Sequence, residues 1–80
     1  MTGRRSPRRD FRAVTQRRGT YDSAMMFDVQ LQVAATGALV WAQSFSDEQQ
    51  AEAFQRQLDE DLRTMENEPF RRKYGVPSNT

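Results

Sequence analysis

The most constraining feature of this chain is a helical stripe of apolar residues that follows two runs of strand-like alternation. The stripe consists of Ala51, Phe54, Leu58, Leu62 and Met65, in steps of three or four residues. Residues spaced in this way lie on one face of an α-helix, and the other side of the same segment is mostly charged. The pattern predicts an amphipathic helix that buries its stripe against the preceding strands.

Large apolar residues alternate with polar ones from 27 to 33 and again from 39 to 45, which predicts two strands. Gly37 lies between the two runs and can take the positive φ of a tight loop, so the strands are expected to form a β-hairpin. The side expected to face the helix carries Phe27, Val29, Leu31, Val33, Leu39, Trp41 and Phe45.

The helix boundaries follow from capping residues and prolines. Ser46 is the expected N-cap, because Gln49 three residues later completes a capping box. The helix is expected to end near Asn67, ahead of Pro69. A second short helix carries Phe70 and Tyr74 and stops at Gly75, and residues 77–80 are expected to be a frayed tail.

The first 20 residues differ from the rest in charge. They hold seven arginines and one aspartate, a charge of +6, whereas residues 21–80 carry −5. Phe11 and Val14 are their only large apolar residues, too few to offset the entropy of ordering. A disordered basic arm is expected over residues 1–20, with an edge strand at Phe11–Gln16 left open. The predicted fold is α+β, a ββα domain over residues 21–76 behind that arm.

Catalysis is not expected, because the chain has no cysteine and no histidine. Thiolate chemistry, cysteine zinc sites and a proton shuttle at neutral pH are therefore excluded, and no metal or other cofactor is expected. Asp59, Glu60 and Asp61 are adjacent on the helix, which spreads them around its axis. A phosphohydrolase-like role for Asp59 and Asp61 is the remaining enzymatic alternative.

The arginines of the arm are the candidate binding residues, because guanidinium groups pair with phosphates and release counterions. These residues are Arg4, Arg5, Arg8, Arg9, Arg12, Arg17 and Arg18. We expect a binding module whose arm engages nucleic acid or another polyanion and whose acidic body contacts protein. The alternative is a protein–protein adaptor or assembly subunit, in which the arm only solubilises the chain or folds onto the acidic helix.

The polar side of the hairpin is a second candidate surface. It carries Asp28, Gln30, Gln32, Ala42 and Ser44. Glutamines on a β-ribbon could hydrogen-bond to adenine edges in a major groove, and a merely solvated sheet surface is the alternative.

No apolar stretch reaches the length of a membrane span, and the arginine-rich start lacks the apolar region of a twin-arginine signal. A transit peptide is the other interpretation of that start, although Gly3, Pro7 and Gly19 interrupt an amphipathic helix there. We expect a cytoplasmic protein with no membrane partner and no small-molecule substrate.

Phe45, Ala51 and Phe54 stand at a strand-to-helix junction. Their spacing resembles that in the N-terminal arm-binding module of phage-type tyrosine recombinases, over about 30 residues. The resemblance implies a small sheet backed by one helix that binds DNA with the sheet. The chain departs from that pattern at Asp47, where the family prefers a small hydroxyl residue, and in lacking a third strand evident from sequence.

A homodimer or a place in a larger assembly is also expected, because a hairpin and one helix form a thin core with unpaired strand edges. The strand Phe27–Val33 has no proline or lysine and is the expected edge for pairing with a second copy.

Overall fold

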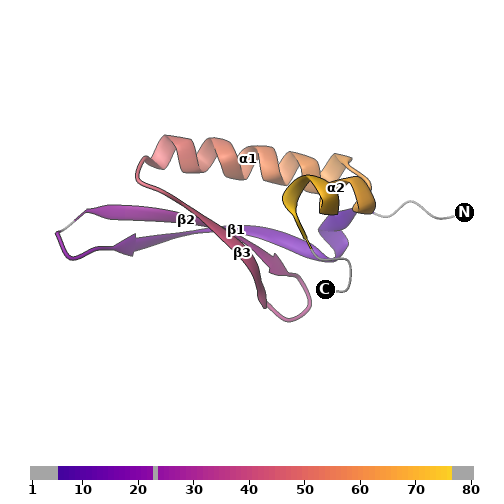
Figure 1. Cartoon of the computed structure of the whole chain (residues 1–80), viewed down its shortest axis with the longest axis horizontal. Helices are drawn as coiled ribbons and strands as arrows, with labels where there is room; N and C mark the ends of the chain where they lie inside the picture. Colours follow the sequence, from indigo (N-terminus) through magenta and orange to yellow (C-terminus); the bar gives the residue numbers. More distant parts are fainter. Residues whose placement is uncertain (1–5, 23, 77–80) are drawn as a thin grey trace, which may run out of the picture.

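The computed structural model describes residues 6–22 and 24–76. A short 3-10 helix η1 (Pro7–Arg9) leads into a sheet of β1 (Phe11–Gly19), β2 (Met25–Val33) and β3 (Leu39–Phe45). Two helices follow, α1 (Glu48–Thr64) and α2 (Asn67–Tyr74). The α+β class, the hairpin of β2 and β3, the long helix and the short helix are confirmed, and the edge strand left open at Phe11–Gln16 is present as β1 (Figure 1).

All three strands are antiparallel in the order β1-β2-β3. Phe11 pairs with Val33 and Gly19 with Met25, so β1 and β2 align along their whole length. The β2–β3 turn is closed by the Gly37 amide, which donates to the Val33 carbonyl at 2.7 Å, and Gly37 has a φ of 78° as expected. The sheet is therefore a meander whose central strand is β2.

The expected disorder of the arm is wrong for the described residues from Ser6 onward, and the domain begins before residue 21. Phe11 is only 2% exposed and stacks on Phe70 of α2, with ring centroids 6.2 Å apart. Arg71 adds a cation–π contact, its guanidinium carbon 5.2 Å from the centre of the Phe11 ring. Contacts made by distant parts of the chain therefore order β1. Residues 1–5 and 77–80, the ends of the expected arm and tail, lie outside the described residues.

The position of β1 also corrects the expected dimer edge. Strand β2 pairs with β1 on one side and with β3 on the other, so Phe27–Val33 has no free edge to offer a second copy.

A β-bulge alters one face assignment in β3. Leu31 pairs with Trp41, but the next residue, Gln32, pairs with Leu39, so Val40 is an extra residue. Leu39 therefore lies opposite Gln32, on the side away from the core, and is 59% exposed. The expectation that Leu39 faces the helix is wrong, whereas Val29 and Leu31 are fully buried.

The apolar stripe of α1 packs on the sheet as predicted. Ala51, Leu58 and Leu62 are buried, and Phe54 contacts Trp41 with ring centroids 6.0 Å apart. The N-cap is Asp47 rather than Ser46, and its Oδ1 accepts from the Gln49 amide at 2.9 Å. Both residues can cap a helix, and the carboxylate is the one that reaches an unpaired amide of the first turn.

Helix α2 begins at Asn67 and ends at the C-cap Gly75, which has a φ of 66°. Pro69 falls within its first turn, where no intrahelical amide donor is required. Helix α1 ends earlier than expected, at Thr64 and not near Asn67. Tyr74 stacks on Trp41 with ring centroids 6.0 Å apart. Helix α2 therefore closes the end of the sheet at which β1 and β3 begin.

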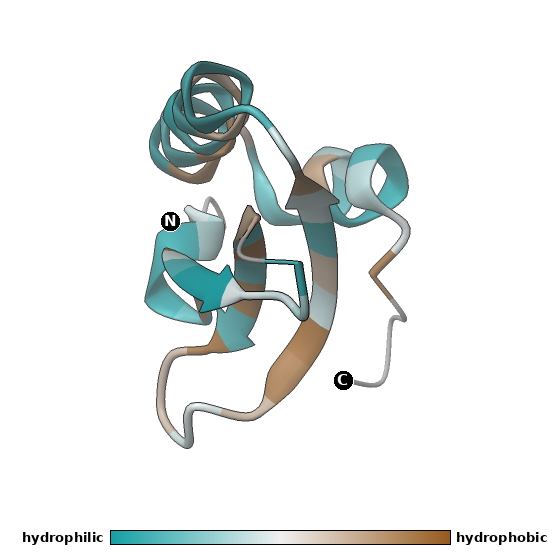
Figure 2. Ribbon diagram, turned by 90° about the vertical axis from the view of Figure 1, so that its left-hand side faces the viewer, coloured by the Kyte–Doolittle hydropathy of each residue, from teal (hydrophilic) through white to brown (hydrophobic). Residues whose placement is uncertain are grey.

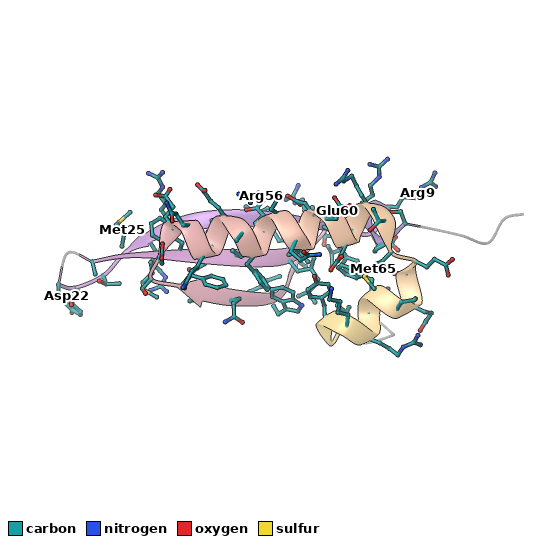
Figure 3. All side chains as sticks on the ribbon, turned by 90° about the horizontal axis from the view of Figure 1, so that it is seen from above. Arg9, Asp22, Met25, Arg56, Glu60 and Met65 are labelled. Carbon is teal, nitrogen blue, oxygen red and sulfur yellow. The ribbon has the colours of Figure 1, made fainter. Side chains whose placement is uncertain are left out.

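The β1–β2 hairpin extends past the start of α1, and Asp22 marks its tip (Figure 3). The described structure is correspondingly elongated, with extents of 53 × 22 × 18 Å. Seen along this long axis, the outer surface of α1 is mostly hydrophilic (Figure 2). Within residues 6–22 and 24–76, no helix has the length and apolar character required to cross a membrane.

Candidate nucleic-acid interface

The two faces of the sheet differ in what covers them. Phe27, Val29 and Leu31 face α1 and are buried, so the alternate residues of each strand point to the opposite side, which neither α1 nor α2 covers (Figure 1). We call this side the uncovered face. By register it carries Arg12, Val14, Gln16, Arg18, Met26, Asp28, Gln30, Gln32, Leu39, Ala42 and Ser44.

A chain of hydrogen bonds crosses this face at one end. Arg12 Nε donates to Gln32 Oε1 at 2.9 Å, and Gln32 Nε2 donates to Gln30 Oε1 at 2.8 Å. The Gln32 side chain lies beneath this network, at 9% exposure, whereas Arg12 is exposed. The bonds fix the orientation of both amides and leave the terminal guanidinium nitrogens of Arg12 accessible to a ligand.

The other end of the face has a charge pair. Arg18 donates to both carboxylate oxygens of Asp28, at 2.9 and 3.2 Å, and Ser44 Oγ donates to Asp28 Oδ1 at 2.7 Å. The hydrogen bonds from Arg18 and then Ser44 lower the pKa of Asp28 below its ordinary value. Asp28 is therefore ionised at neutral pH, and its charge is balanced by Arg18.

The structure separates the seven predicted arginines into different surroundings. Arg12 and Arg18 share the uncovered face, at opposite ends of β1 and about 20 Å apart for a strand rise of about 3.3 Å per residue. Arg17 points to the other side and forms an ion pair with Glu48 at 3.2 Å. Arg8 and Arg9 lie on η1. Arg4 and Arg5 lie outside the described residues.

Sequence reasoning missed the contribution of β1 to this face. The polar side of the hairpin was identified from Asp28, Gln30 and Gln32, but Arg12 and Gln16 were assigned to a flexible arm. Residues 12–18 carry no alternation of apolar and polar side chains that could have revealed the strand, because Val14 lies on one side and Arg17 on the other.

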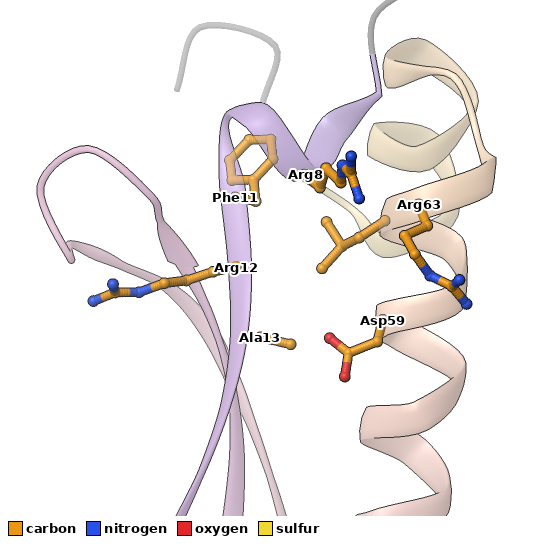
Figure 4. Close-up of a pocket in the computed structure, with 7 residues that line it drawn as sticks. Arg8, Phe11, Arg12, Ala13, Asp59 and Arg63 are labelled. Carbon is orange, nitrogen blue, oxygen red and sulfur yellow. The ribbon is translucent and has the colours of Figure 1, made fainter.

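A groove of about 420 Å³ lies on the opposite side of β1, between that strand, η1 and α1. Its floor is apolar, and its rim carries Arg8, Asp59 and Arg63 (Figure 4). The side chain of Ala13 points toward α1, whereas that of Arg12 points away from it. The groove and the uncovered face thus lie on opposite sides of β1 and adjoin at Arg12, which also borders the groove.

Asp61, one of the two acids of the enzymatic alternative, holds the helices together. It is only 6% exposed, and it accepts from Lys73 Nζ at 2.7 Å, from the Tyr74 hydroxyl at 2.5 Å and from Gln57 at 3.1 Å. Burial alone would raise the pKa of Asp61, but these hydrogen bonds outweigh it and lower the pKa. Burial, followed by the bond to Asp61, raises the pKa of Tyr74.

The carboxylates do not converge on a common point. Asp59 lines the groove beside β1, whereas Asp61 faces α2. In the part of the chain that the structure describes, no three acidic side chains gather closely enough to hold a metal ion.

Comparison with protein-family models, with curated proteins and with solved structures finds no match to this chain.

Proposed function

We propose that this protein is a non-enzymatic module that binds duplex DNA against the uncovered face of its sheet. One observation carries the proposal: β1 places Arg12 and Arg18 at the two ends of a face on which Gln30 lies between them, its amide oriented through Gln32. Arginines at both ends can contact phosphates, and the amide of Gln30 can hydrogen-bond to adenine.

The dimensions of the face suit a major groove. A β-ribbon enters the major groove of B-DNA, which is about 12 Å wide. Strands in a sheet lie about 4.8 Å apart, so a two-stranded ribbon such as β1 and β2, which carry Arg12, Arg18 and Gln30, is about 10 Å wide. The deep, narrow major groove of an RNA duplex excludes such an element, which favours DNA over double-stranded RNA.

The distribution of charge favours one face of the protein for contact with a polyanion. Asp28 is the sole carboxylate among the described residues of the uncovered face, and Arg18 balances it. The exposed acids of α1, including Glu48, Glu52 and Glu60, lie on the far side of the sheet. A polyanion is therefore attracted to the uncovered face and repelled from the helix, which leaves the helix surface available for protein contacts.

The test is the affinity for a labelled duplex, measured by fluorescence anisotropy over a series of salt concentrations. Log affinity should fall linearly with log salt, with a slope of about −0.9 per phosphate neutralised. Arg12→Gln should reduce the magnitude of that slope by about one. Arg56→Gln is the matched control, because Arg56 is an exposed arginine on α1 (Figure 3), and it should leave the slope unchanged.

Two further variants examine the face itself. Asp28→Asn should strengthen binding, because it removes the carboxylate that competes with phosphate for Arg18. Gln30→Ala should weaken sequence preference while leaving the salt slope intact. Equal loss of affinity for the duplex in Arg12→Gln and Arg56→Gln would show that the uncovered face is not the DNA-binding site.

The protein–protein adaptor is the second candidate function, and exposed apolar residues favour it. Tyr21 is fully exposed at the hairpin tip, and Met25 beside it is 44% exposed. A wild-type chain without salt-dependent affinity for duplex DNA would support the adaptor over the DNA-binding module.

A further inference from the structure

We propose that the free edge of β3 pairs with β3 of a second copy of this chain, antiparallel about a two-fold axis that passes between the two Ala42 residues. The inference concerns assembly and does not depend on the proposed binding of DNA. It replaces the expected pairing through β2, whose two edges are already occupied.

The two edges of the sheet differ in how they are protected. At the β1 edge, Gln55 of α1 donates from Nε2 to the Ala13 carbonyl at 3.5 Å and also accepts from the Thr15 hydroxyl. Arg17 reaches from the same strand to Glu48 of α1. Side chains of the helix thus engage β1, and charged residues on a strand and cover by a helix are the usual means of blocking edge pairing.

Strand β3 lacks the charged side chains that would block pairing at its free edge. Leu39–Phe45 contains no charged residue and no proline. Ala42, Gln43 and Ser44 are exposed, and Leu39 is 59% exposed at the start of the strand. An uncharged strand can pair with its own copy without bringing like charges opposite each other.

A buried donor without a partner selects the register. Trp41 Nε1 is buried and lacks a hydrogen-bond acceptor among the described residues. Nearly all such groups in folded proteins are satisfied, so an exception calls for an explanation. The indole borders a pocket of about 300 Å³ at the β3 edge, whose lining residues are Trp41, Ala42, Gln43, Phe54, Lys73 and Tyr74.

Pairing centred on Ala42 places an amide beside this indole. In that register Trp41 lies directly opposite Gln43 of the second copy, and opposite residues in a strand pair point to the same face of the sheet. The Gln43 side chain of the second copy then enters the region of the pocket and brings its Oε1 to the indole N–H. The two-fold axis repeats the contact, so both indoles gain an acceptor in one symmetric interface.

The axis also provides a stringent test, because residue 42 of one copy lies opposite residue 42 of the other. Ala42 is exposed and its side chain is small, so charged substitutions are compatible with the folded monomer. Ala42→Lys and Ala42→Glu each bring like charges together across the axis, whereas a mixture of the two variants brings opposite charges together.

Light scattering in the absence of nucleic acid should give twice the 9.3 kDa chain mass for the wild type at high micromolar concentration. Each Ala42 variant alone should give the single-chain mass, and an equimolar mixture should recover the dimer. Gln16→Lys, an exposed position on β1, is the control and should remain dimeric. Gln43→Leu should raise the dissociation constant of the dimer about tenfold.

A single-chain mass for the wild type at every concentration would overturn the inference. A dimer that persists in both Ala42 variants would also overturn it, because the interface would then lie away from β3. Circular dichroism of each variant separates loss of pairing from loss of the fold, and recovery in the mixture cannot arise from unfolded chains. Because DNA is absent, failure here leaves the proposed DNA-binding function untouched.

Discussion

Phe11 stacks on Phe70 with ring centroids 6.2 Å apart, so the first strand is fastened to the last helix. Phe11 is 2% exposed and Phe70 is fully buried. The contact closes the domain by joining residues that are nearly 60 positions apart in the sequence.

Truncation of this contact should be among the most damaging single changes. Phe11→Ala should lower the free energy of unfolding by about 3–5 kcal/mol, because it removes a buried ring and leaves a cavity. Urea denaturation followed by the fluorescence of Trp41 measures the change. Tyr21→Ala serves as the control, since Tyr21 is fully exposed and its loss should have little effect. Similar midpoints for the two variants would contradict the packing described here.

Deletion experiments should distinguish the first strand from the residues before it. A chain that begins at Ser6 retains η1, β1 and every described contact, and should keep a cooperative unfolding transition. Deletion of residues 1–18 removes η1 and almost all of β1, exposes the edge of β2 and should abolish the cooperative transition. Thermal melts of both truncated chains test this, and a cooperative melt of the shorter chain would show that β1 is dispensable.

Asp61 should give the domain a stability that depends on pH. Its pKa in the folded state lies below the ordinary value of 3.8, so the unfolded chain binds the proton first as the pH falls. The stabilisation is therefore complete above about pH 5 and is lost as the pH falls through the ordinary pKa toward the folded-state value. Urea midpoints at neutral and acidic pH should show this loss in the wild type.

Asp61→Asn should weaken the domain at neutral pH by about 2 kcal/mol, because hydrogen bonds to a charged group are replaced by neutral ones. The variant should also lose part of the pH dependence, and the remainder includes Asp28, whose pKa is lowered too. An unchanged pH profile in Asp61→Asn would show that the link to Lys73 and Tyr74 does not stabilise the fold.

Gly75 should tolerate a side chain poorly. It has a φ of 66°, in the left-handed region, and alanine there should cost about 1 kcal/mol. Gly19→Ala is the matched control, because a methyl group meets nothing within 4 Å at either position among the described residues, and Gly19 does not have a positive φ. Chemical denaturation should therefore give a lower free energy of unfolding for Gly75→Ala than for Gly19→Ala.

The sequence was sufficient to predict the elements whose apolar pattern is self-contained. The α1 stripe and the alternation of β2 determined both the helix and the sheet face on which it packs, and the contact of Phe54 with Trp41 joins the two predicted faces. The N-cap was misplaced by one residue, because Ser46 and Asp47 are both competent caps.

Strand β1 could not be predicted in the same way. Phe11 and Val14 lie on opposite faces of β1, so they form no apolar stripe of their own. Their ordering depends on Phe70, Arg71 and Gln55, and no local pattern in residues 11–19 reveals these partners. The bulge at Val40 was hidden for a similar reason, since the alternation of residues 39–45 continues through it in the sequence.

The projecting β1–β2 hairpin implies a gradient of amide hydrogen exchange within a single strand. At Val29 and Leu31, β2 is buried beneath α1, so the backbone amides of that region should exchange only when the whole domain opens. Toward Met25 the same strand extends past the helix, and local fraying should be enough for exchange. The protection of β2 should therefore increase steadily from its first residue to its middle. The projecting end of the sheet should open locally, while the part beneath the helix stays closed until the whole domain unfolds.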